Sequence, residues 1–172
     1  MRKSLTIAAA VLALGAAACG KKQVETAPPP AEEVPAAPGE TVAPGDVELT
    51  ELPAAQADLI AKAGSDTVYF GTDKYDLDQA TQATLAAQAR WLIANPNVRA
   101  SIEGHADERG TREYNMALGE RRANAARDFL VAQGVPTARL LVTSWGKERP
   151  VAPGSNEEAW AQNRRAVTVL VR

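Results

Sequence analysis

Residues 103–123 read EGHADERGTREYNMALGERRA, and this stretch decides the fold. Directly before this stretch, Val98, Ala100 and Ile102 alternate with polar residues, and the alternation continues to Glu103. This is the period-two pattern of a half-buried strand. After a glycine-containing loop, apolar residues recur at helical spacing from near Thr111 until Gly134, a residue suited to end a helix. The stretch therefore predicts a strand, a loop and a long helix, with a dense polar cluster where the strand ends.

The segments on either side extend this alternation of strands and helices. Strand-forming residues fill 66–70, 140–145 and 166–171, and helical spacing runs from a cap at Asp78 to Asn95, with a short helix over 155–162. The order is βαβαβ(α)β. It predicts an α+β fold, a two-layer α/β sandwich in which a mixed four-stranded sheet carries its helices on one face.

The N-terminus has the features of an export signal. Arg2 and Lys3 precede an apolar run of about 14 residues, Leu5–Ala18, which is too short to span a bilayer and suits a signal peptide over residues 1–18. Small residues lead directly into Cys19, the only cysteine, as in the bacterial lipoprotein signal, although Ala16 stands where leucine is usual. We therefore expect Cys19 to carry an S-diacylglycerol and an N-acyl (palmitate) chain. The alternative is an ordinary secretory signal that leaves a free thiol.

Residues 19–58 are predicted to form a disordered linker, and residues 59–172 a single domain. The linker is rich in proline, alanine and glutamate and has a charge near −6 from Lys21 to Asp58, whereas the domain is near +2. About 35 such residues reach at most roughly 100 Å. The formal net charge of −2 argues against a nucleic-acid partner.

The polar cluster has the charges needed to bind a zwitterion. Asn115, Leu118 and Arg122 are spaced i, i+3 and i+7, so they share one face of the helix. Asp107 in the loop suits an ammonium, while Arg122 and the helix N-terminus suit a carboxylate. An amino-acid head group fits this pattern. A structural salt bridge between Asp107 and Arg122 is the alternative.

The run from Gly104 to Ala123 resembles the signature of the outer-membrane-protein-A-like (OmpA-like) peptidoglycan-binding domain. Further matching segments are Asp73–Asp76, Ser144–Pro150 and Asn163–Val167. The resemblance implies that Asp107 takes the ammonium and Arg122 the carboxylate of diaminopimelate in the peptidoglycan stem peptide. It also implies a pocket lined by the remaining candidate residues, Phe70, Thr72, Asp73, Asn115 and Leu118. Thr72 departs from the aromatic or aliphatic residue usual at its position.

The same resemblance implies a place in the cell envelope. With Gly20 after the cysteine, it favours an outer-membrane lipid anchor with the domain in the periplasm. There the protein would tether the outer membrane to the cell wall. It further implies a partnership with TolB and the Tol system in envelope integrity and cell division, with TolB competing for the peptidoglycan site.

Enzymatic function is the competing class, represented by a peptidoglycan hydrolase such as an amidase or carboxypeptidase. No serine lies in a Gly-x-Ser-x-Gly elbow, and His105 is the only histidine, without further metal ligands at diagnostic spacing. We therefore expect no catalytic residue, no metal and no cofactor beyond the lipid. Arg164 and Arg165 are interpreted as solvated charges, with a role beside the pocket as the alternative.

Overall fold

The computed structural model describes residues 50–172, so the predicted signal peptide, Cys19 and most of the predicted linker lie outside the described part. The elements, in chain order, are α1 (Pro53–Ala63), β1 (Thr67–Tyr69), α2 (Gln79–Ala94), β2 (Arg99–His105), α3 (Arg112–Ala132), η1 (Thr137–Arg139), β3 (Leu140–Gly146), α4 (Glu157–Asn163) and β4 (Arg165–Val171). Within residues 50–172, none of the helices has the length and apolar character needed to cross a membrane.

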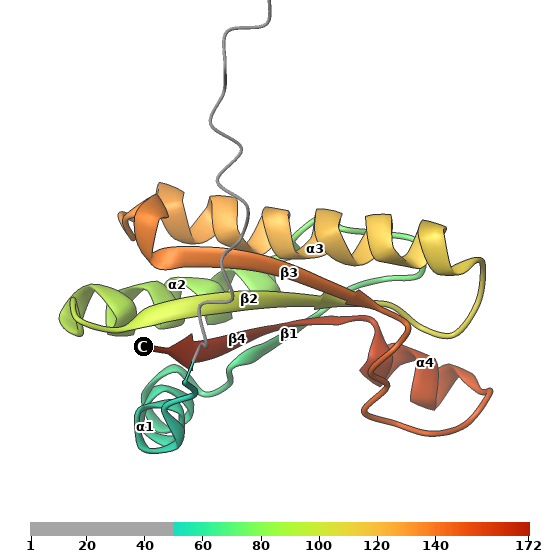
Figure 1. Ribbon diagram of the computed structural model, residues 1–172, viewed down its shortest axis with the longest axis horizontal. Coiled ribbons are helices and arrows are strands. Elements are labelled where there is room, and N and C mark those ends of the chain that lie inside the picture. The colour runs from blue at the N-terminus through green and yellow to red at the C-terminus, as the bar shows by residue number, and fades with distance from the viewer. Residues whose placement is uncertain (1–49) are drawn as a thin grey trace, which may run out of the picture. The chain divides into compact units, whose positions relative to one another are not determined.

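The four strands form one mixed sheet in the order β1-β4-β2-β3. β4 lies between β1 and β2 and is antiparallel to both, while β2 and β3 are parallel. Figure 1 shows α3 running along β2 and β3, with its N-terminal end at the end of the molecule that carries α4. The predicted α+β class and mixed four-stranded sheet are confirmed.

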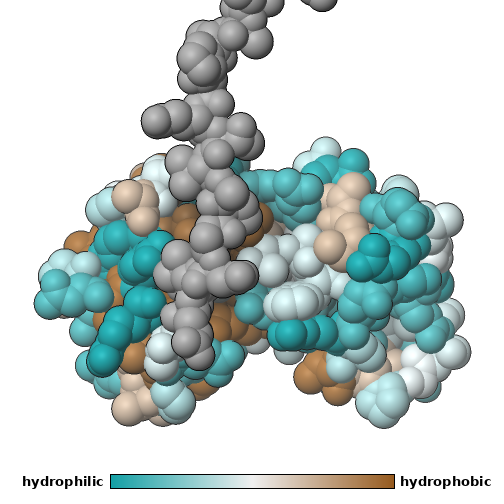
Figure 2. All heavy atoms as spheres, viewed as in Figure 1, coloured by the Kyte–Doolittle hydropathy of each residue, from teal (hydrophilic) through white to brown (hydrophobic). Residues whose placement is uncertain are grey.

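The helices form the second layer and bury an apolar core against the sheet. Leu85, Ala89 and Leu92 of α2 meet Ile102 and Leu170 of the sheet in this core. The predicted start of α2 and the predicted ends of α3 are also confirmed. The side chains of Asp78 and Thr111 cap the N-termini of α2 and α3. Gly134, with a φ of 100°, follows the C-terminus of α3. Figure 2 shows a mostly hydrophilic surface over the end with α4, while apolar side chains gather towards α1.

The folded part begins earlier than the predicted boundary at residue 59. α1 starts at Pro53, within the range assigned to the linker. Three contacts attach it: Leu59 is fully buried, Trp91 donates to Asp58 at 2.8 Å, and the side chain of Gln56 bonds to the backbone of β4 at Thr168 and Leu170. The composition of residues 53–57 is linker-like, and these long-range contacts are what make the segment helical.

α3 packs against β2 through two glycines. A Cβ at Gly104 would lie 1.8 Å from the carbonyl oxygen of Gly119, and a Cβ at Gly119 would lie 2.4 Å from Oγ of Ser144. Only glycine permits so close an approach of helix backbone and strand. The contact sets the height of α3 over the sheet, and so places its first turns beside the end of β2.

Candidate binding site

A cavity of about 310 Å³ opens where β2 ends and α3 begins. Its wall combines the loop after β1, the loop after β2 and the first two turns of α3. The lining residues are Thr72, Asp73, Asp107, Arg109, Gly110, Tyr114, Asn115 and Leu118. Six site residues besides Asp107 were predicted, and four of them line the cavity: Thr72, Asp73, Asn115 and Leu118.

Asp107 is a buried carboxylate surrounded by cationic groups. It accepts hydrogen bonds from the backbone N–H, Nε and Nη2 of Arg109 at 3.1, 3.0 and 2.7 Å, and Nη1 of Arg164 lies 3.6 Å from its Oδ2. Burial raises the pKa of Asp107, but the hydrogen bonds and charge of Arg109, with the charge of Arg164, outweigh it and hold the pKa below its usual range. The side chain is therefore anionic at neutral pH.

Arg122 is fully buried behind the cavity wall and does not line the cavity. It donates to the carbonyl oxygens of Lys74 and His105 at 2.8 Å each and to that of Gly71 at 3.1 Å. Burial lowers its pKa to about 10, so it stays charged at neutral pH. Within residues 50–172, Asp107 pairs with Arg109 and Arg164 and not with Arg122, so the alternative of an Asp107–Arg122 salt bridge is wrong.

Phe70 supports the site from beneath instead of lining it. Its ring is buried in the core, and the guanidinium of Arg122 lies 5.3 Å from the ring centroid. The segment that follows Phe70 forms the rim. There Asp73 has a φ of 57° and its carboxylate accepts a hydrogen bond from the hydroxyl of Tyr114. Arg122, which lies over the Phe70 ring, thus holds the rim segment in place through the carbonyls of Gly71 and Lys74.

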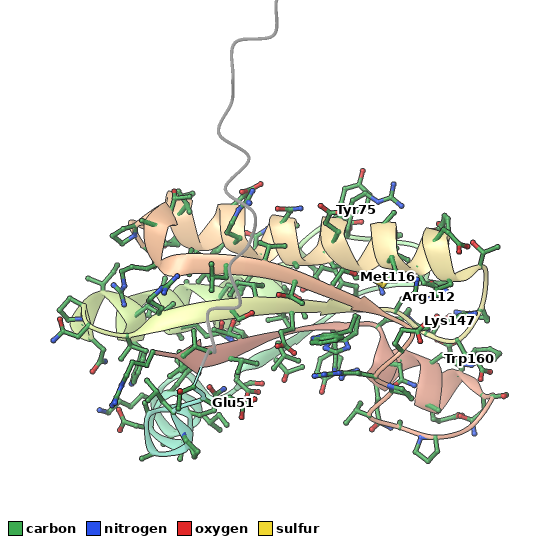
Figure 3. The ribbon with its side chains drawn as sticks, viewed as in Figure 1. Glu51, Tyr75, Arg112, Met116, Lys147 and Trp160 are labelled. Carbon is green, nitrogen blue, oxygen red and sulfur yellow. The ribbon has the colours of Figure 1, made fainter. Side chains whose placement is uncertain are left out.

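The loop between β2 and α3 is held by two side chains, one from α3 and one from the segment that follows β3. Asn115 donates to the carbonyl oxygen of Arg109 at 2.8 Å, and Lys147 donates to those of Glu108 and Gly110 at 3.2 and 2.7 Å. Figure 3 shows Lys147 close to Arg112, at the start of α3. Because three consecutive carbonyls are engaged, the loop presents Asp107 in a fixed position.

Arg164 and Arg165 are buried, which corrects their interpretation as solvated charges. Arg164 donates to the carbonyl oxygen of Phe70 at 3.1 Å and to Glu157 at 2.6 Å, in addition to its ion pair with Asp107. Arg165 donates to the carbonyl oxygen of Arg149. Their place before a strand gave no sign of burial, because the partners are distant in sequence.

Arg109 and Tyr114 are site residues that the sequence reasoning did not select. The signal for Arg109 was present, since an arginine two residues after a loop carboxylate can return to it and form a fork-shaped pair. Tyr114 gave less indication, because its partner Asp73 lies 41 residues earlier.

His105 lies beneath the loop and is buried. Burial, together with the charges of Arg165 and Arg149, lowers the pKa of its imidazole to about 4. The side chain is therefore neutral at physiological pH, and only its backbone carbonyl contacts the site, through Arg122.

The site lies in a part of the chain that matches known proteins. Residues 69–164 match the OmpA family. The peptidoglycan-associated lipoprotein of Agrobacterium fabrum is 44% identical over 170 residues, which cover 99% of this chain and 89% of that protein. The peptidoglycan-associated lipoprotein of Rhizobium meliloti is 54% identical over 118 residues, covering 69% of this chain and 66% of that protein.

Solved structures show the same fold. The crystal structure of the peptidoglycan-associated lipoprotein from Burkholderia pseudomallei is similar with a TM-score of 0.61 and 46% identity, covering 62% of this chain and 91% of that one. The C-terminal domain of Helicobacter pylori MotB is similar with a TM-score of 0.56 at 21% identity, covering 61% and 83%. The second likeness concerns the fold alone.

Proposed function

The chain belongs to the OmpA family, and on that premise we propose that its folded part binds peptidoglycan and does not cleave it. The observation that carries the proposal is the buried, anionic Asp107 held by a fixed loop at a cavity beside the start of α3. The relatives that align over this cavity are named for an association with peptidoglycan.

The ligand group that suits this cavity is the diaminopimelate of a stem peptide. Its side-chain ammonium is proposed to meet Asp107, with Thr72, Asp73, Asn115 and Leu118 shaping the space around it. Arg122 is proposed to serve the ligand's carboxylate. Because Arg122 is fully buried and holds the carbonyls of Gly71 and Lys74, a direct contact would require the segment 71–74 to move. Without that movement, Arg122 acts through its charge and by fixing the wall.

Anchoring is proposed to lie at the other end of the chain. Cys19, lipidated in the outer membrane, would hold the membrane while the folded part holds the wall, with the acidic, proline-rich linker between them. Support comes from the sequence around Cys19 and from relatives named as lipoproteins. In this arrangement the protein tethers the outer membrane to the cell wall from the periplasmic side.

A link to TolB and the Tol system in envelope integrity and cell division is proposed on family resemblance alone. If TolB covers the same cavity, it competes with peptidoglycan. Adding purified TolB to chain already bound to sacculi should then release the chain into solution.

Hydrolysis of peptidoglycan is the competing function. A zinc amidase needs a convergent ligand set, and in the part of the chain that the structure describes no three His, Cys, Asp or Glu side chains are grouped to hold a metal ion. This supports binding over cleavage.

The experiment that separates the two functions incubates purified chain with sacculi and analyses both fractions. We expect the chain to sediment with the sacculi and the supernatant to contain no muropeptides. Released muropeptides would contradict the proposal, and so would a chain that stays in the supernatant.

A further inference from the structure

We propose that the Arg109 side chain closes the cavity by occupying the carboxylate of Asp107, so that a ligand's ammonium must displace it. The inference rests on the proposed function, since it concerns how the same cavity admits its cation. In this role, the Arg109 side chain competes with the ligand's ammonium for the carboxylate of Asp107 and so regulates binding.

Arg109 satisfies both oxygens of Asp107. Its Nε lies 3.0 Å from Oδ1 and its Nη2 lies 2.7 Å from Oδ2, in the two-pronged geometry that matches guanidinium to carboxylate. A carboxylate that is already neutralised attracts a second cation weakly. The Arg109 side chain is 40% exposed and that of Asp107 only 9%, so an incoming cation meets Arg109 first.

The Arg109 side chain can leave without moving its backbone. The carbonyl oxygens of Glu108, Arg109 and Gly110 are held by Lys147 and Asn115, as described above. A change of rotamer is therefore sufficient. Arg164, the other cation near Asp107, is fixed by Phe70 and Glu157 and is buried, so Arg109 is the movable member of the pair.

While bound to Asp107, the guanidinium of Arg109 also lies against α4. Arg109 lies over the ring of Trp160, 4.2 Å from its centroid, and Trp160 is held by a 3.0 Å hydrogen bond from its Nε1 to Glu108. The charges of Glu108 and Glu157 also favour the cationic form of Arg109 and contribute to raising its pKa, after the hydrogen bond to Asp107. Figure 3 shows Trp160 on α4, at the end of the molecule that carries Lys147 and Arg112. A side chain released from Asp107 therefore has an aromatic face and acidic side chains close to it.

The test measures the affinity of the full chain, purified in detergent, for a stem tetrapeptide that contains diaminopimelate. Arg109→Gln removes the competing charge, and we expect the tetrapeptide to bind about five- to tenfold more tightly. The reason is that Arg109 no longer occupies Asp107, so a larger fraction of the molecules can bind the ammonium. Arg112→Gln is the matched control. Arg112 is an exposed arginine at the start of α3 that pairs with Glu148, so its loss should change the affinity by less than about twofold.

A second tetrapeptide, acetylated on the side-chain ammonium of diaminopimelate, identifies the group that competes. Arg109→Gln should give no gain for this probe. Equal or weaker binding of the unmodified tetrapeptide by Arg109→Gln would overturn the inference while leaving the cavity as the binding site. An equal gain in Arg112→Gln, or with the acetylated probe, would overturn it too. Failure of the wild type and both variants to bind would overturn the proposed function, and the inference with it.

Discussion

At the scale of single residues, Asp107 and Arg122 have different tasks. Asp107 faces the cavity and carries its deepest negative charge, whereas Arg122 lies behind the wall and holds three backbone carbonyls. Changing Asp107 should therefore affect ligand binding above all, and changing Arg122 should also affect the fold.

Asp107→Asn keeps the shape of the side chain and removes its charge. We expect a loss of sacculus binding of roughly 2 kcal/mol or more, because the ammonium loses its charged partner. We also expect a drop in stability of about 1–3 kcal/mol, because the buried Arg164 loses a charged partner. Co-sedimentation with sacculi and urea unfolding measure the two effects. Asp128→Asn, which removes an exposed acid paired only with its neighbour Arg127, is the control and should leave both values unchanged.

Arg122→Ala leaves the carbonyls of Gly71, Lys74 and His105 without their donor. Since each unsatisfied buried polar group costs about 1–3 kcal/mol, we expect the free energy of unfolding to fall by several kcal/mol. Denaturant titration checks this. Stability equal to that of the wild type would show that the segment 71–74 does not depend on Arg122.

His105 makes stability depend on pH. Its pKa is about 4 in the folded state and ordinarily 6.5, so between these values the unfolded chain binds a proton that the folded chain does not. The free energy of unfolding should therefore fall as the pH drops from 6.5 to 4, by up to about 3 kcal/mol from this group. His105→Gln should flatten this part of the curve, and an unchanged slope would contradict the assignment.

At the scale of elements, the close packing of α3 against β2 positions the site. Gly104→Ala would drive a Cβ into the backbone of α3 at Gly119, and we expect it to lower stability by about 3 kcal/mol or more, or to prevent folding. Gly71→Ala is the comparison, because the nearest atoms there belong to the flexible side chain of Lys74. Melting temperatures that fall equally in both variants would count against a special role for the Gly104–Gly119 contact.

Elements with a clear local pattern could be predicted from the sequence, whereas those that depend on distant partners could not. The alternation around Ile102, the cap at Asp78 and the helical spacing from near Thr111 predicted β2, α2 and α3. α1 was missed because its helix depends on contacts with Trp91 and β4. On α2, Trp91 is buried and held by Asp58, whereas Ile93 is 49% exposed.

The same distinction between local patterns and distant partners holds for the residues of the site. Asp107, Asn115 and Leu118 could be assigned because strand end, loop and helix face follow from a single stretch of sequence. The burial of Arg122 could not, since it depends on carbonyls about 50 residues earlier. The ion pair of Arg164 with Asp107 could not be predicted for the same reason, because Arg164 lies 57 residues further along the chain.

At the scale of the whole molecule, the proposed tether requires the chain to be held at two places, in the membrane through Cys19 and at the cell wall through its folded part. The predicted lipid on Cys19 lies outside the described residues, so it is tested separately. Cys19→Ser should leave the protein in the soluble periplasmic fraction, because without acyl chains no hydrophobic anchor remains. Fractionation of cells that carry either form checks this, and membrane retention of the serine variant would contradict lipidation.

An NMR titration of the chain with a diaminopimelate-containing stem peptide tests directly whether the cavity binds this ligand. We expect saturable amide shifts that cluster at the residues around the cavity, from Thr72–Asp73 and from Asp107 to Leu118. We also expect Asp107→Asn to weaken these shifts. Saturable shifts confined to α1 or to the far end of α3, or no shifts at all, would contradict binding at this cavity.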